Sequence, residues 1–129
     1  MTLLDSKSGR FISPPAERLT AWVTSSTQNP TLGILQPGSY VYSVRMHVTQ
    51  AFNSDGTDNI SVGYDGTTNA YCTNTDVSTT GVKTPTLGSG IGYDSTARTV
   101  EAYYTNGGSE PSAGKALVIV EFFRVPLSP

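Results

Sequence analysis

The stretch "YVYSVRMHVTQAF", residues 40–52, decides the fold of this chain. Apolar and polar side chains alternate along it, with Tyr42, Val44, Met46 and Val48 on one face and Arg45, His47 and Thr49 on the other. A period of two residues is typical of a β-strand with one buried face. The same period recurs at residues 60–64 and 97–105, so we expect sheets that bury one face against a core.

Short strands are expected at residues 19–24, 69–73 and 91–94, and a long strand at residues 115–125. Turns rich in Gly, Asp, Asn and Pro separate them, because these residues fit the tight backbone geometry of turns. Charged residues make up only 14% of the chain, and Ser and Thr, which total 33, supply the outward polar positions. We predict an all-β fold: a single β-sandwich of jelly-roll or immunoglobulin-like type, with about seven to eight short antiparallel strands and an extended N-terminal arm.

The N-terminal part of the sequence differs from the rest. Residues 1–37 carry short apolar clusters without a sustained period, so we assign them to the extended arm and assign residues 38–129 to the sandwich. The arm is expected to hold at most one short strand, over residues 19–24, with a short helix over residues 15–22 as the alternative. Its apolar side chains need another surface to cover them.

The last predicted strand, "KALVIVEFFRV", is the least polar part of the chain. It is apolar on both faces around residues 117–120, and Phe122 and Phe123 point to opposite sides. Its apolar run "ALVIV" is far shorter than the ~20 residues of a membrane helix. A strand that is apolar on both faces lies in the centre of a two-layer core or is covered by a neighbour on its outer face.

A phosphate-binding loop is excluded at the turn before this strand. Gly114 and Lys115 match the end of that motif, which also needs a glycine five residues before Gly114 and Ser or Thr after the lysine. Those positions hold Ser109 and Ala116, and a strand follows where the motif requires a helix.

Composition narrows the class of protein further. The chain has 129 residues, enough for one domain, and a net charge of −2, which gives no electrostatic reason to bind nucleic acid. The single cysteine, Cys72, excludes an internal disulfide and is expected to be buried. The first residues, "MTLLDSKSGR", lack the features of a signal peptide, so we expect a soluble protein made in a cytoplasm.

Candidate chemical sites are few. Asn53, Asp55 and Asp58 lie close together in one turn, where calcium is an alternative to simple turn chemistry. His47, the only histidine, is expected at the surface, because the sequence shows no nucleophile or carboxylate oriented against it. We therefore predict no catalytic, cofactor-binding or metal-binding residues and no enzymatic activity.

Aromatic side chains offer one further possibility. Trp22, Tyr71, Tyr103 and Tyr104 would suit a platform that binds sugar, whereas packing in the core or between subunits is the commoner role of aromatic residues in strands.

Three segments resemble small structural proteins of tailed bacteriophages, namely β-sandwich head proteins described as capsid decoration or cement proteins. The segments are "HVTQAFNSDGTDNISVGYDG", "DVSTTGV" and "ARTVEAYYTNGGSEPSAGKALVIVEFFRV". The features that carry the resemblance are an Asp-Gly turn that leads into a Val-Gly strand, a Thr-Thr-Gly connection, and a Ser-Ala-Gly-Lys-Ala turn that leads into the last strand.

The resemblance implies a non-catalytic capsid decoration protein of the virion. Such a protein binds the outer surface of a phage head, has the major capsid protein as its partner, often forms trimers, and contacts neither nucleic acid nor membrane. A carbohydrate-binding or receptor-binding module of a phage fibre is the first alternative, and a small hydrolase is the second. We expect the assembly interface to include the following residues: Leu3, Leu4, Arg10, Phe11, Ile12, Trp22 and Phe123.

Overall fold

The computed structural model describes residues 3–4, 11–12 and 16–125, and within these residues every regular element is a strand. The strands are β1 (Leu3–Leu4), β2 (Phe11–Ile12), β3 (Glu17–Thr24), β4 (Thr31–Leu35), β5 (Ser39–Gln50), β6 (Asp58–Tyr64), β7 (Thr67–Asp76), β8 (Gly81–Lys83), β9 (Gly92–Asp94), β10 (Arg98–Asn106) and β11 (Lys115–Arg124). This described part therefore contains no helix that is long and apolar enough to cross a membrane.

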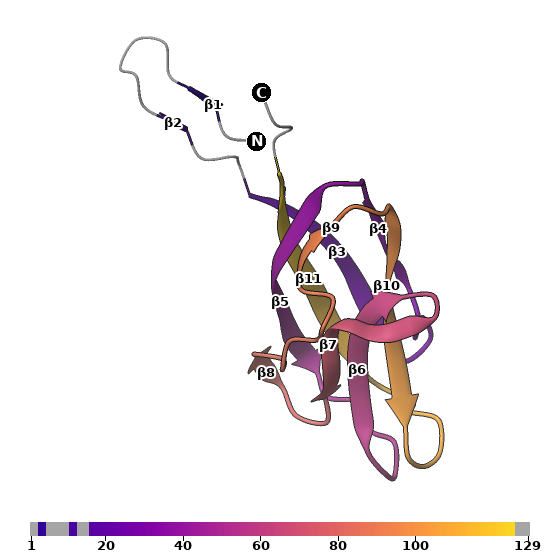
Figure 1. Ribbon diagram of the computed structural model, residues 1–129. Coiled ribbons are helices and arrows are strands. Elements are labelled where there is room, and N and C mark those ends of the chain that lie inside the picture. The colour runs from indigo at the N-terminus through magenta and orange to yellow at the C-terminus, as the bar shows by residue number, and fades with distance from the viewer. Residues whose placement is uncertain (1–2, 5–10, 13–15, 126–129) are drawn as a thin grey trace.

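Two antiparallel sheets pack face to face (Figure 1). One has four strands in the order β4-β10-β6-β7, and the other has five, with β3, β11 and β5 side by side and both β8 and β9 paired with β5. The short strands β1 and β2 pair only with each other. The predicted all-β sandwich is confirmed.

The core lies between the two sheets, where alternate side chains of each strand meet. Val100 and Ala102 on β10 are fully buried, as are Val118 and Val120 on β11. Their neighbours in sequence, including Tyr103, face outward and stay partly exposed. The alternation predicted for residues 97–105 is confirmed, because the strand period of two places every second side chain on the core face. On β6, Ile60 and Val62 are buried as predicted, but Ser61 and Gly63 between them are buried as well, so burial does not alternate there.

One position on β5 departs from the predicted alternation. Along β11, Glu121 lies opposite Ser43 and Phe122 lies opposite Val41, so Tyr42 is an extra residue in the ladder. This β-bulge reverses the alternation, and Tyr42 is 37% exposed whereas Val41 is buried. The prediction that Tyr42 shares a face with Val44 is therefore wrong.

The strand pairing also limits the extent of any N-terminal arm. Residues 1–37 were expected to form an arm, yet β3 pairs with β11 along its whole length and β4 pairs with β10. The segment around Leu19 is a strand rather than the alternative helix. An arm can therefore comprise only residues before Glu17.

The connection from β8 to β9 runs along the outer edge of β7. The backbone N–H of Thr73 donates to the carbonyl of Thr86, and the N–H of Gly90 donates to the carbonyl of Ala70. A Cβ atom on Gly88 or Gly90 would overlap the backbone of Ala70, so only glycine allows this close approach. The segment covers a sheet edge that would otherwise expose unpaired backbone groups.

Candidate functional site

The turn predicted as a calcium candidate holds two loops together. The Asn53 side-chain oxygen accepts hydrogen bonds from the N–H groups of Ser112 and Ala113, at 2.9 and 3.0 Å. Asp55 accepts one from the Ser109 N–H at 2.6 Å, and hydrogen bonds from Ser109 lower the pKa of this carboxyl.

Asp58 completes this turn from a buried position. Its Oδ1 accepts hydrogen bonds from the Tyr104 hydroxyl and from the backbone N–H of Ser54. The three predicted oxygen ligands are thus engaged within the protein. Among the described residues, no three His, Cys, Asp or Glu side chains lie close enough together to hold a metal ion.

The remaining predicted candidates are dispersed. His47 is exposed, and the hollow beside it contains no nucleophile or carboxylate among its lining residues. Cys72 is buried as predicted, and burial raises the pKa of its thiol to about 12, which leaves it protonated and unreactive.

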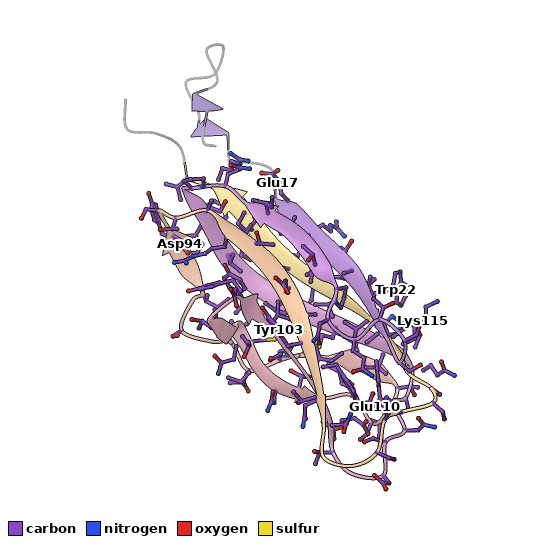
Figure 2. The ribbon with its side chains drawn as sticks, turned by 90° about the vertical axis from the view of Figure 1, so that its right-hand side faces the viewer. Glu17, Trp22, Asp94, Tyr103, Glu110 and Lys115 are labelled. Carbon is purple, nitrogen blue, oxygen red and sulfur yellow. The ribbon has the colours of Figure 1, made fainter. Side chains whose placement is uncertain are left out.

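A common aromatic platform is not formed. Tyr71 and Tyr104 are 1% and 6% exposed and belong to the core, whereas Trp22 is 43% exposed on the other sheet. Figure 2 shows Trp22 beside Lys115 and well separated from Tyr103, which lies on the outer face of β10.

The outer face of the five-stranded sheet carries a continuous row of exposed, mostly apolar side chains. Leu117 on β11 lies directly opposite Trp22 on β3 and opposite His47 on β5, and His47 lies opposite Val82 on β8. The row thus crosses four strands in register. Val82 at its end is 71% exposed.

A hollow of about 210 Å³ lies beside this row, lined by Arg45, Met46, His47, Val82, Leu117 and Ile119. Arg45 forms an ion pair with Glu121 at 2.7 Å, so its charge is turned toward the neighbouring strand. At the other end of the row, the Lys115 ammonium lies 4.7 Å from the centre of the Trp22 ring and fixes the indole by a cation–π contact.

Aromatic side chains extend the same face toward the other end of the sheet. Phe123 stacks on Tyr40 with 4.9 Å between ring centres, and Tyr42 packs against Phe123 at 5.9 Å. Tyr93 on β9 lies opposite Tyr40 and is 56% exposed. We call this surface the apolar face, and it consists of Trp22, Tyr40, Tyr42, His47, Val82, Tyr93, Leu117, Ile119 and Phe123.

The apolar face includes two of the residues predicted for the assembly interface, Trp22 and Phe123, at well-separated positions. Leu3, Leu4, Phe11 and Ile12 are described only as the paired backbone of β1 and β2, and Arg10 lies outside the described residues. The sequence indicated that β11 is apolar on both faces. It did not indicate that Val82 belongs to an exposed strand face, because β8 is only three residues long.

Comparison with solved structures shows the same fold in phage capsids. A chain of the cyanophage Pam1 capsid asymmetric unit aligns with a TM-score of 0.66 and 18% identity, over 94% of this chain and 97% of that chain. A chain of the acid-stable capsid of Helicobacter pylori bacteriophage KHP30 has a TM-score of 0.63 and 21% identity, over 84% and 86% of the two chains. A chain of the Ralstonia phage GP4 capsid has a TM-score of 0.55 and 18% identity, over 99% and 92%.

No protein-family model and no curated protein sequence matches this chain. The predicted resemblance to β-sandwich head proteins of phages is therefore confirmed at the level of the fold.

Proposed function

We propose that this protein is a non-catalytic structural protein of a phage virion, a capsid decoration protein that docks its apolar face onto the major capsid protein at the outer surface of the head. The observation that carries the proposal is the apolar face, on a fold shared nearly end to end with a chain of a phage capsid. Glu121, opposite Arg18 and Ser43, separates the row around Leu117 from the aromatic group around Phe123, and exposed apolar patches of this kind mark protein interaction sites.

The geometry of the apolar face suits a permanent contact. Interface residues that contribute most to binding are commonly aromatic and fill or surround small desolvated hollows. Here Val82 and Leu117 of the row line the adjoining hollow of about 210 Å³, which is large enough for one apolar side chain of the partner. Arg45, the charged residue among the described residues that line the hollow, is paired with Glu121, so covering it does not leave its charge unpaired.

The part of the chain before Glu17 belongs to the proposal as a second contact. Leu3, Leu4, Arg10, Phe11 and Ile12 are proposed to reach a neighbouring capsid subunit or a sister copy. The decoration proteins that the sequence resembles are often trimers, and we extend that state to this chain. In this proposal the protein is made in the host cytoplasm and then binds to a preformed head.

Localisation on virions tests the proposal most directly. Particles assembled with a C-terminally tagged copy of the protein are labelled with gold-conjugated antibody and imaged in negative stain. Label distributed over the head surface is the expected result. Label at the tail fibres would instead support the receptor-binding alternative, and label-free virions would exclude any virion role.

A deletion variant separates the two proposed contacts. Removal of residues 1–37 would delete β3 and β4 and so destroy both sheets, whereas removal of residues 1–15 leaves all strands of the sandwich intact. We expect the 1–15 deletion to fold with an unchanged circular dichroism spectrum and to bind undecorated heads more weakly. Unchanged binding would refute the contribution of the N-terminal residues while leaving the apolar face to be tested separately.

A further inference from the structure

A second surface lies on the opposite side of the sandwich, on the outer face of the four-stranded sheet. It is a hollow of about 560 Å³, which we call the polar groove. Its lining consists of Asn29, Ser61, Thr68, Asn69, Thr73, Asn74, Tyr103, Tyr104 and Thr105. Every one of these side chains carries a hydroxyl or an amide, and none carries a charge.

The walls of the groove are built into the fold. Ser61 and Gly63 occupy alternate outward positions on β6, and a Cβ atom on Gly63 would overlap the backbone of Thr67 and Thr68. The first residues of β7 therefore cross close to β6 at Gly63, next to Thr68 and Asn69 of the lining. Only glycine permits this close approach.

Asn29 fixes the opposite wall. Strand β4 stops pairing with β10 at Thr31, and beyond it the carbonyl of Pro30 accepts from the Ala102 N–H at 3.1 Å. The Asn29 side chain then continues the ladder, because its Oδ1 accepts from the Tyr104 N–H at 3.0 Å. Its amide is thereby held at the border of the groove with the –NH₂ group uncommitted to the backbone.

The floor places an aromatic ring among uncommitted hydrogen-bonding groups. Tyr103 on β10 lies directly opposite Ser61 on β6, and both line the groove, where Ser61 is only 4% exposed. Within the described residues, no protein group hydrogen-bonds to the side chains of Ser61, Asn69 or Asn74. Hydroxyl and amide groups both donate and accept, whereas a carboxylate only accepts and an ammonium only donates.

The charges nearest to the groove select against anionic ligands. Burial raises the pKa of the Tyr103 hydroxyl, and the negative charges of Glu101 and Asp65 raise it further. Since no Lys or Arg lines the groove, a phosphate, sulfate or acidic sugar would meet repulsion without a compensating partner. A cation would find no carboxylate ligand in the lining.

We propose that the polar groove binds a neutral saccharide, with Tyr103 packing against the C–H face of one sugar ring and Asn29, Ser61, Asn69 and Asn74 exchanging hydrogen bonds with its hydroxyls. A saccharide presents donors and acceptors around an apolar ring face, which is the complement of this lining. The site does not depend on the proposed capsid role. If the protein docks through the apolar face, the groove on the opposite sheet faces away from the head and toward the glycans of a cell surface.

Titration of the isolated protein tests the site. The ¹⁵N-labelled chain is titrated with glucose, galactose, mannose, rhamnose and N-acetylglucosamine, and with neutral oligosaccharides of these sugars, while amide shifts are recorded. We expect saturable shifts that cluster on β6, β7 and β10. No saturable shift with any of these sugars, or shifts that cluster on the apolar face, would overturn the proposal.

Three variants locate the binding energy. Tyr103→Ala and Asn69→Ala are each expected to weaken the association by about tenfold or more, because each removes an anchor of the sugar ring or its hydroxyls. Thr99→Ala is the matched control, because Thr99 is an exposed outward residue of β10 that does not line the groove. Its affinity should stay within about twofold of the wild type. Equal weakening in Thr99→Ala, or full binding by a folded Tyr103→Ala, would contradict the proposed site.

Thermal melts of each variant separate loss of binding from loss of folding. Because Asn69 is exposed, Asn69→Ala tests the site even if truncation of Tyr103 destabilises the sheet. The titration uses no capsid, so its failure would leave the decoration role intact. If the protein were absent from heads, that result would not contradict the proposed saccharide site.

Discussion

Replacing Val82 by Ser tests whether the apolar face is the surface that docks on the head. Full burial of a valine side chain is worth about 1.5–3 kcal/mol relative to full exposure. Because 71% of Val82 is still exposed in the isolated protein, covering it in an interface leaves about 1–2 kcal/mol per copy to be gained. Val82→Ser should therefore weaken binding to heads by about five- to thirtyfold.

Ile34→Ser provides the matched control. Ile34 is also an exposed β-branched residue, at 58%, but it lies on β4 and faces outward from the four-stranded sheet. Since both side chains are already largely exposed, neither substitution should cost much stability. The two variants thus differ mainly in which face of the sandwich loses apolar surface.

Co-sedimentation with heads that lack the protein gives the measurement. Increasing amounts of each purified variant are mixed with a fixed amount of heads, and the bound fraction is read from the pellet. The expected outcome is a binding curve shifted to higher concentration for Val82→Ser and an unshifted curve for Ile34→Ser. Equal binding by Val82→Ser and wild type, or a larger loss in Ile34→Ser, would refute docking through the apolar face.

Three further predictions concern stability and reactivity. Tyr104→Phe removes the hydroxyl that donates to the buried carboxylate of Asp58, and we expect urea unfolding to show a loss of about 1–3 kcal/mol; no change would mean that the hydrogen bond contributes nothing. Burial alone would raise the pKa of Asp94, but hydrogen bonds from Arg98 and Thr96 outweigh it and hold the pKa below 3.8. The lowered pKa stabilises the folded state above pH 3.8, and this stabilisation is lost as the pH falls through the folded-state pKa. The difference in unfolding free energy between wild type and Asp94→Asn should therefore shrink from about pH 6 to about pH 3. A difference that stays constant over this range would contradict the prediction. The Cys72 thiol should resist a thiol reagent at neutral pH until the protein is denatured, and immediate labelling of the native protein would show that the residue is accessible.

The sequence predicted those parts of the fold that depend on local periodicity. The alternation around Val62 and Val100 identified β6 and β10, because each position's face follows from its neighbours within one strand. Tyr42 was assigned to the wrong face, because its bulge arises from the register with β11, about eighty residues away along the chain. Strand β4 was missed because it is short and contains Gly33, whose φ of +153° is one that other residues rarely adopt and which gives no strand signal.

The functional surfaces required the strand order, which the sequence does not reveal. The apolar character of Leu117 was visible, but its placement between Trp22 and His47 follows only from the pairing of β11 with β3 and β5. The aromatic platform, considered as an alternative to packing in the core, is not formed, since neighbouring residues on one strand, Tyr103 and Tyr104, face opposite sides of the sheet. Because side chains alternate along a pleated strand, the Tyr103 ring lies in the groove and the Tyr104 ring lies in the core.

The position of β11 has a consequence for how the chain folds. β11 follows all the other described strands in sequence, yet it lies between β3 and β5 in the sheet, and Phe122 pairs with Glu17 across almost the whole described sequence. The edges of β3 and β5 that pair with β11 stay unpaired until residues 115–124 have left the ribosome. Like that of other domains dominated by distant strand pairs, folding is therefore expected to take milliseconds to seconds. During that interval the unpaired edge of β5 is the part of the nascent chain most exposed to aggregation.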